Sequence, residues 1–495
     1  MKKALLVLSL SCCFIWAAAQ QNIQLVSQLD FVSLANDIWG YTAPDGTEYA
    51  LVGLRSGVSI VSLTDPANPE EIHFIPGEHS AWRDMKTWGH YAYVTTDQPG
   101  TKEGILVIDL SGLPDAVDYY NWRPWLDDFA DSLFTCHNIW IDEFGYAYLT
   151  GCNVNSGGVV FLDVFSLPGG TPQYAGKGSP IGSHDTYARD NILYSAEILA
   201  GQFGVYDVTD KANPVLLATQ PTPRRFSHNV WLSDDGKTLF NTDEKANAPV
   251  SSFDISDLEN IRLLDEFRPP ATLGTNVIPH NVHVLNDYLV ISHYTDGCVI
   301  VDASHPDNLV QAGWYDTNTD FTESYHGAWG AYPFFPSGLI AISDIENGLF
   351  ILKPEYKRAC RLEGTVTDAV TGAAVKDVTV SILSGDPNFA ATGGNGAYKT
   401  GQPTAGAFEV VFKVKGYFDT TAEAVLTNGE LTLLDVTMTP FPAFEVLGRA
   451  VEKGTEKPIA GAVVFLENDD FAYTDTTDDS GTFWLPAVLL GDYNV

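Results

Sequence analysis

The sequence is poor in positive charge. Its 495 residues include 27 lysines and arginines against 63 aspartates and glutamates, which gives a formal net charge of −36 and an isoelectric point near 4.4. Nucleic acid and anionic lipid surfaces both need a basic partner, so this composition argues against either as a ligand. Solubility is the simplest explanation of the acidity itself.

Long apolar runs are absent beyond the N-terminus, which argues against a later membrane-spanning helix. Residues 1–19 have the pattern of a secretory signal peptide: two lysines, an apolar run and three alanines. We expect cleavage before Gln20, and a lipoprotein anchor at Cys12 or Cys13 is the alternative. The sequence therefore predicts an exported bacterial protein, secreted or held at the cell surface.

Cysteine is scarce, since the sequence has six and only four remain once the leader is removed. Cys136 opens one expected strand and Cys152 closes the next, so the turn between the strands places the two side by side. In an exported protein this pair forms either a disulfide or two buried thiols. Cys298 and Cys360 have no evident partner.

Common catalytic signatures are missing as well. The sequence has no Gly-x-Ser-x-Gly elbow, no His-Glu-x-x-His, no phosphate-binding loop and no Cys-x-x-Cys pair. Their absence argues against a common hydrolase or a nucleotide-dependent enzyme.

What the sequence has instead is a short segment that recurs seven times. Cys136-His137-Asn138-Ile139-Trp140 is the clearest copy, and the copies lie roughly 45–55 residues apart. Each is followed by a turn, an apolar run, a second apolar run that often ends in aspartate, and a final strand. Four short strands per period are typical of a propeller blade. The predicted fold class is therefore all-β, with a seven-bladed β-propeller over residues 20–357.

The two ends of this array predict how it closes. Residues 23–31 form a strand with no blade before it, and the seventh repeat stops after three strands. We expect residues 23–31 to pair with residues 349–353 and complete the last blade, because this removes an exposed sheet edge.

A different β pattern begins at residue 361. Strands alternate with turns every eight to twelve residues or so, which predicts a complete β-sandwich over residues 361–440. The pattern restarts and then ends at Val495, before the equivalent point of the first copy. We therefore expect a second, truncated β-sandwich over residues 445–495, in a chain that is a C-terminally incomplete version of a longer product.

These patterns resemble known families. The run Gly104-Ile105-Leu106-Val107-Ile108-Asp109 and its relatives resemble the LVIVD-repeat propellers, and residues 21–354 look like the secreted bacterial choice-of-anchor B family. Residues 361–440 and 445–495 resemble the carboxypeptidase regulatory-like domain, a transthyretin-like sandwich. The resemblance implies a surface protein with a sorting tail. It implies no particular reaction, and peptidase activity does not follow from it.

The histidine of the repeated segment is the main candidate for a site. The first strand of each blade is innermost in a propeller, so equivalent residues form a ring around the axis. The expected ring is Asn36, Arg83, His137, His184, His228, His280 and His326. Neutral imidazoles bind Zn, Cu, Fe or Ni, so the five histidines are candidate ligands of a divalent transition metal. Alternatively, each histidine hydrogen-bonds a carbonyl of the neighbouring blade and locks the blades together.

Acidic residues are expected at the same opening, because the second strand of each blade runs back towards it. With two ring residues they form the candidate ligand-binding set Asn36, Arg83, Glu197, Asp243 and Glu244. Asp243 is expected roughly opposite His228, in a register that a slip of one residue would reverse. Arg83 counts against a symmetric metal site and would suit an anionic ligand instead.

Two functions follow as hypotheses. The favoured one is a non-catalytic binding or scaffold protein that uses one propeller face to hold an extracellular protein or a glycan. Aromatic residues such as Trp122 and Trp125 serve either as core or as sugar-stacking platforms. The alternative is a metal-dependent oxidase or oxygenase-like enzyme built on the histidine ring, which is similar in outline to the carotenoid-cleaving oxygenases. The sequence names no substrate, partner or metal.

Overall fold

The computed structural model describes residues 20–386 and 388–495, and the chain divides into two compact units, Met1–Lys357 and Arg358–Val495. The described part is all-β, as predicted, and its helical segments are the short 3₁₀ turns η1 (Asn155–Gly157), η2 (Pro168–Gly170) and η3 (Pro270–Thr272). None of these described helices is long and apolar enough to cross a membrane. The predicted signal peptide, with the alternative anchor at Cys12 or Cys13, lies outside the described residues.

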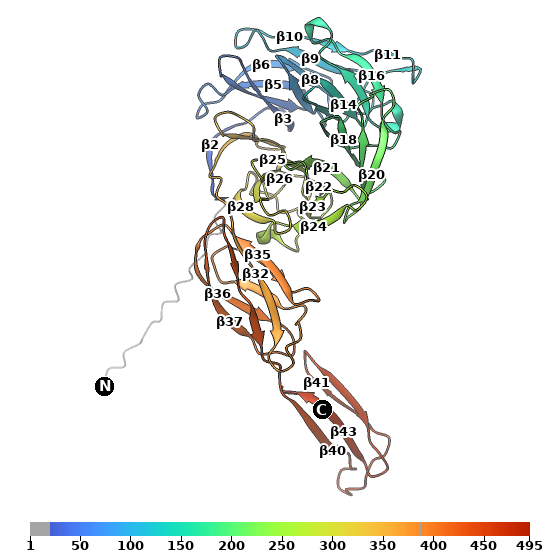
Figure 1. Cartoon of the computed structure of the whole chain (residues 1–495), viewed down its shortest axis with the longest axis vertical. Helices are drawn as coiled ribbons and strands as arrows, with labels where there is room; N and C mark the ends of the chain where they lie inside the picture. The colour runs from blue at the N-terminus through green and yellow to red at the C-terminus, as the bar shows by residue number, and fades with distance from the viewer. Residues whose placement is uncertain (1–19, 387) are drawn as a thin grey trace, which may run out of the picture. The chain divides into compact units, whose positions relative to one another are not determined.

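Unit 1 consists mainly of four-stranded antiparallel sheets that follow one another along the chain (Figure 1). The first sheet has the order β3 (Ala35–Thr42), β4 (Glu48–Leu54), β5 (Gly57–Ser62), β6 (Glu70–Pro76). The second has β7 (Met85–Trp88), β8 (Tyr91–Val94), β9 (Ile105–Asp109), β10 (Asp118–Trp122). The third has β13 (Asn138–Ile141), β14 (Tyr146–Thr150), β15 (Val160–Asp163), β16 (Gln173–Lys177).

The same order recurs in the second half of unit 1. The fourth sheet has β17 (Thr186–Arg189), β18 (Ile192–Glu197), β19 (Gln202–Asp207), β20 (Val215–Pro221). The fifth has β21 (Ser227–Leu232), β22 (Thr238–Asp243), β23 (Val250–Asp254), β24 (Arg262–Phe267). The sixth has β25 (Asn281–Leu285), β26 (Tyr288–Ser292), β27 (Cys298–Asp302), β28 (Val310–Tyr315), with β1 (Gln20–Gln21) beside β28.

The last sheet of unit 1 joins the two ends of the sheet array. It contains β29 (Ala328–Tyr332), β30 (Ile340–Asp344) and β31 (Gly348–Pro354), and its fourth strand is β2 (Ile23–Leu29). Leu29 pairs with Leu349 and Ile23 with Pro354 in an antiparallel ladder. The predicted pairing of residues 23–31 with residues 349–353 is therefore confirmed.

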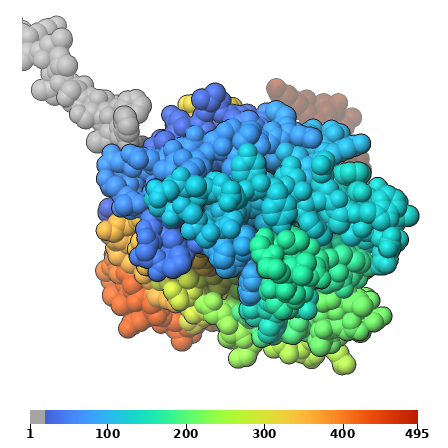
Figure 2. Space-filling model, turned by 90° about the horizontal axis from the view of Figure 1, so that it is seen from above, coloured from blue at the N-terminus to red at the C-terminus, as the bar shows by residue number. Residues whose placement is uncertain are grey.

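The core of unit 1 lies between neighbouring sheets. Strand β4 is buried along its whole length, whereas the outermost strands are largely exposed, as in β10. Leu51 and Ile60 of the first sheet share one apolar cluster with Ala92 and Ile108 of the second. Packing on both faces explains the uninterrupted apolar runs of the central strands. Seen from above, the blue to green part of unit 1 forms a continuous packed surface (Figure 2).

The disulfide predicted as one of two alternatives is present. Cys136 and Cys152 are bonded and flank the hairpin of β13 and β14, while Cys298 and Cys360 are buried free thiols. A small hairpin of β11 (Trp125–Leu126) and β12 (Asp131–Ser132) precedes the first of the bonded cysteines. The disulfide links the two ends of the hairpin of β13 and β14, and one of its cysteines directly precedes His137.

Unit 2 begins with two sheets that share one apolar core, which includes Leu362, Val380 and Phe412. One sheet contains β35 (Ala397–Gln402), β32 (Cys360–Asp368), β38 (Leu431–Leu433) and β39 (Val436–Met438). The other contains β34 (Ala390–Ala391), β33 (Thr379–Ile382), β36 (Gly406–Lys413) and β37 (Thr420–Leu426).

The last strands of unit 2 form two separate two-stranded ladders. These are β40 (Ala443–Arg449) with β43 (Thr482–Leu489), and β41 (Val463–Glu467) with β42 (Ala472–Thr476). Their apolar core contains the buried residues Leu466, Leu485 and Val488, while Leu447 is 73% exposed.

Candidate functional site

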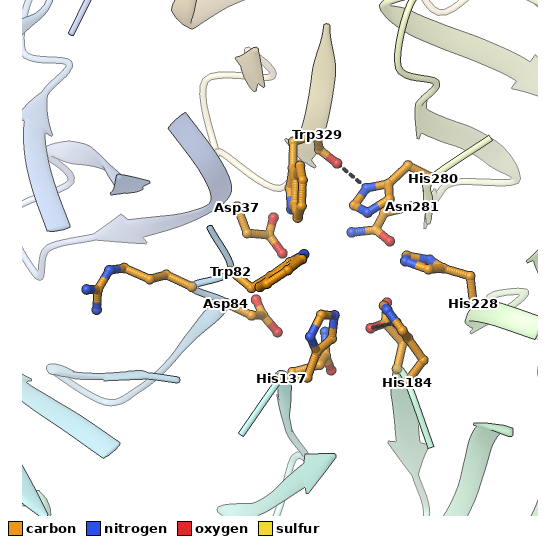
Figure 3. Close-up of a pocket in the computed structure, with 12 residues that line it drawn as sticks. Asp37, Trp82, Asp84, His137, His184, His228, His280, Asn281 and Trp329 are labelled. Atoms are coloured by element: carbon orange, nitrogen blue, oxygen red, sulfur yellow. Dashed lines mark hydrogen bonds and ion pairs between the residues drawn. The ribbon is translucent and has the colours of Figure 1, made fainter. Parts of the chain in front are cut away.

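Four of the ring histidines converge in unit 1. They lie at the starts of the innermost strands β13, β17, β21 and β25, and they are His137, His184, His228 and His280. The ring centroids of consecutive members are 4.1, 4.0 and 4.5 Å apart. Figure 3 shows the four imidazoles pointing towards a common central space, with Trp82, Asp84 and Trp329 also around it. The repeated segment thus brings distant parts of the chain together as a row of rings in edge-on and tilted contact.

Threonine hydroxyls bond the main chain of three of these histidines from the sheet that precedes each histidine. A threonine near the end of the second strand donates its hydroxyl hydrogen to the carbonyl oxygen of the next sheet's histidine. The pairs are Thr95 with His137 at 3.2 Å, Thr150 with His184, and Thr242 with His280 at 2.5 Å. Because these contacts involve only the main chain of the histidines, they position the imidazoles without using a ring nitrogen.

The residue after the ring position also joins neighbouring sheets in three of the repeats, at Asp84, Asp185 and Asn229. The main-chain N–H of Ile139 donates to Asp84 Oδ2 at 2.9 Å, and that of Val282 donates to Asn229 Oδ1 at 3.1 Å. Asn229 Nδ2 donates in turn to Asp185 Oδ2 at 3.0 Å. These side chains hold neighbouring sheets together, which is the role that the alternative to a metal site assigned to the imidazoles. Among the converging histidines in the described chain, only His280 hydrogen-bonds a neighbouring sheet's carbonyl through its ring, that of Trp329 (Figure 3).

A bulge places His228. The ladder of β21 with β22 shifts between Ser227 and Asn229, so His228 has no partner residue in it. Asp243 pairs with Ser227, and the expectation that it lies opposite His228 is therefore wrong by one residue. An extra residue in one strand turns its side chain out of the regular alternation, and here Glu244, the residue after Asp243, approaches the imidazole.

Three of the four imidazoles have a fixed tautomer. Nδ1 of His137 lies 2.9 Å from Asp97 Oδ2, and Nδ1 of His184 lies 3.2 Å from Asp185 Oδ1. Nδ1 of His280 faces the carbonyl oxygen of Trp329. Carboxylate and carbonyl oxygens accept hydrogen bonds, so each Nδ1 carries the proton and each Nε2 presents a lone pair.

His228 is the exception, because neither of its ring nitrogens has a hydrogen-bond partner although its side chain is only 1% exposed. Burial, reinforced by the neighbouring histidines, holds its pKa well below the usual value. Burial likewise lowers the pKa of His280 to about 3. Both imidazoles are therefore neutral at neutral pH, which is the form that binds a metal.

Glu244 faces His228 from the end of the second strand. The hydroxyl of Tyr294 donates to its Oε1 at 2.7 Å, and its Oε2 lies 3.7 Å from His228 Nε2. Burial raises the pKa of Glu244 to about 7. Since His228 is neutral, this contact is not an ion pair. Ligand atoms of His184, His228 and Glu244 all lie within 4.8 Å of one another.

The pocket around these groups is small and mostly polar. Its cavity has a volume of about 20 Å³, which is enough for one water molecule or one ion. Its lining includes the four histidines with Asp37, Trp82, Asp84, Asp185 and Trp329. Sequence reasoning missed Trp82 and Trp329, although Trp82 directly precedes a ring position and Trp329 ends one copy of the repeated segment.

Other predicted site residues are engaged by other partners. Arg83 is buried, and its guanidinium donates to Glu103 at 2.9 Å and to Thr96 at 2.8 Å. Asn36 donates weakly to the Ser80 carbonyl at 3.5 Å. Arg83 thus lines the histidine pocket, but its guanidinium is neutralised by the buried carboxylate of Glu103.

The remaining predicted residues make local contacts too. Asp243 accepts hydrogen bonds from the Thr222 hydroxyl and from the main-chain N–H of Arg224. Glu197 accepts hydrogen bonds from Gln202 and Tyr206. His326 bonds Glu346 at 2.7 Å and stacks on Phe321. Of the ten predicted residues, the structure brings together His137, His184, His228, His280 and Glu244.

Matches to known proteins were found for parts of the chain. Residues 361–439 match the family described as the carboxypeptidase regulatory-like domain. The β-propeller domain of Cps50 (Swd1) from Myceliophteria thermophila is similar over 67% of this chain and 99% of its own, with a TM-score of 0.46 and 10% identity. The WD40 repeats of RRP9 are similar over 68% and 98%, with a TM-score of 0.46 and 12% identity. No curated protein matches the chain.

Proposed function

We propose that this chain is an exported, non-catalytic binding protein, secreted or held at the cell surface, that takes a small ligand into the histidine pocket of unit 1. The observation that carries the proposal is the convergence of four imidazoles from four sheets on one cavity. Main-chain and neighbouring polar contacts already hold the sheets together, so most of these rings are free to bind.

The proposed architecture is a seven-bladed propeller of the LVIVD-repeat, choice-of-anchor B kind. Seven sheets over the described part of unit 1, six of four strands and one that β1 extends to five, support this count, and β2 completes the last of them. In this architecture unit 2 supplies one β-sandwich, formed by the sheets of β32 to β39, and a further β domain formed by β40 to β43. We propose that these domains act as spacers between the propeller and the cell surface.

The size of the pocket favours binding over catalysis. A cavity of about 20 Å³ admits an ion or a water molecule and leaves little room for an organic substrate beside it. An oxidase or oxygenase needs room for its substrate beside the metal. The non-catalytic hypothesis is therefore the one we propose.

A ligand panel tests this function. The mature protein is melted with divalent transition metals, calcium, phosphate, and simple sugars, and we expect at least one of these to raise its melting temperature. His137→Ala should reduce that rise, because His137 lines the pocket. His326→Ala is the matched control, since His326 is a ring residue that bonds Glu346 instead, and it should leave the rise unchanged. A panel without any stabilising ligand would overturn the proposal, as would an equal rise in all three proteins.

A further inference from the structure

Within the pocket of the proposed function, we propose that His184, His228 and Glu244 bind a divalent transition metal ion. These three groups come from different loops and strands, yet their ligand atoms lie within 4.8 Å of one another. They are the one such cluster found among the described residues. This inference rests on the pocket being a binding site and adds the chemical identity of what it binds.

The first argument is the state of His228. Both of its nitrogens are buried and unpartnered, whereas buried polar groups in folded proteins almost always have a hydrogen-bond partner. Such a group costs stability unless something else satisfies it. A metal ion bound at Nε2, the nitrogen 3.7 Å from Glu244, would satisfy one of the two.

The second argument is that hydrogen bonds to their non-ligating atoms fix the other two proposed ligands. Asp185 holds Nδ1 of His184, and Asn229 holds Asp185 in turn. A histidine that binds a metal through one ring nitrogen usually donates its other ring N–H to a carboxylate, which orients the ring.

Glu244 is supported in the same way. Tyr294 donates to one carboxylate oxygen and is itself only 1% exposed, so it holds the other oxygen towards His228. Each group of the proposed set therefore has a ligand atom within 4.8 Å of the ligand atoms of the other two.

The geometry suits an ion with little rearrangement. Ligands about 2.1 Å from a tetrahedral ion lie roughly 3.4 Å from each other. The present maximum of 4.8 Å needs only small rotations of side chains around a cavity of about 20 Å³. His137 and His280 flank the set, with ring centroids 4.1 Å from His184 and 4.5 Å from His228, and either can supply a fourth ligand.

The donor types select the kind of metal. Two or three imidazole nitrogens with one carboxylate oxygen suit Zn²⁺, Cu²⁺, Ni²⁺ or Fe²⁺. Calcium and magnesium need mainly oxygen ligands, and the set offers too few.

The test uses the tag-free mature protein stripped with a chelator and then titrated with Co²⁺ and Zn²⁺. We expect one ion per chain by elemental analysis and calorimetry, and Co²⁺ absorption typical of nitrogen and oxygen ligands. His228→Ala and Glu244→Gln should each weaken binding by at least about tenfold. Glu244→Gln keeps the hydrogen bond to Tyr294 and nearly the same volume, so it separates metal binding from folding.

The outcomes separate this inference from the proposed function. If neither ion binds, or if both variants bind as tightly as the parent, the metal assignment is wrong. Should another ligand of the panel still stabilise the parent through His137, the binding function stands without the metal. If no ligand acts through His137 either, both proposals fail.

Discussion

Tyr294 and Glu244 are joined by a hydrogen bond of 2.7 Å that connects the loop after β26 to the end of β22. Tyr294 also pairs through its main chain with Ala328, at the start of β29. Tyr294 thus connects Glu244 with the two following sheets, through its hydroxyl on one side and its main chain on the other. Burial, and then the nearby Glu244 charge, raise the pKa of Tyr294 well above its usual value, so its hydroxyl remains a donor.

Tyr294→Phe tests this contact. The variant keeps the ring and the main-chain bridge to Ala328 and removes only the hydroxyl, so stability should fall by about 1 to 2 kcal/mol. Metal affinity should fall as well, because Glu244 loses the donor that holds it. Chemical denaturation and calorimetry measure the two effects. Tyr325→Phe is the control, since Tyr325 is half exposed, and unchanged metal affinity in Tyr294→Phe would show that Glu244 needs no such support.

Removal of strand β2 tests the joining of the two ends of unit 1. Without residues 20–29, β31 would expose an unpaired edge that recruits other chains. We expect a lower melting temperature and aggregation, measured by size-exclusion chromatography with light scattering. Deleting only residues 20–21 should have little effect, because β1 adds just two residues beside β28. A monomer with unchanged melting after the longer deletion would contradict the role of β2.

The disulfide should stabilise unit 1. Cys136 and Cys152 are 16 residues apart, and closing a loop of that size contributes about 3 kcal/mol to folding. The double variant Cys136→Ser with Cys152→Ser should lose about that much by urea denaturation. A reductant should lower the stability of the parent to the same level and leave the double variant unchanged. Equal stability of parent and variant in the absence of reductant would contradict this expectation.

Asp344 should make stability depend on pH. It is fully buried, and burial raises its pKa to about 6 from an ordinary 3.8. The folded state therefore holds a proton that the unfolded state releases between about pH 4 and pH 6, so stability falls as pH rises through this window. The shift corresponds to about 3 kcal/mol.

Asp344→Asn should remove this dependence, because the amide cannot ionise. Between pH 4 and pH 7 the parent should therefore lose about 3 kcal/mol of unfolding free energy relative to the variant. Urea denaturation at each pH measures it, with the exposed Asp320→Asn as control. A difference that stays constant with pH would show that the Asp344 carboxyl is not perturbed in the folded protein.

The sequence by itself determined the strands and the approximate place of the site. Apolar runs between turn residues predicted the sheets, because a central strand packed on both faces needs apolar side chains on both sides. The orphan strand before the first repeat predicted the pairing of Leu29 with Leu349. The fixed position of the histidine in each repeat predicted that His137, His184, His228 and His280 would converge, since repeats that fold alike place equivalent residues alike.

Only the tertiary structure decided which polar side chains enter the pocket. Arg83 and His326 occupy ring positions, yet Glu103 and Glu346 bind their side chains, and a repeat pattern carries no information about such partners. The bulge at His228 placed Glu244 rather than Asp243 beside the imidazole. The physical reason is that strand side chains alternate between two faces, so a single extra residue exchanges which of two adjacent carboxylates faces the site.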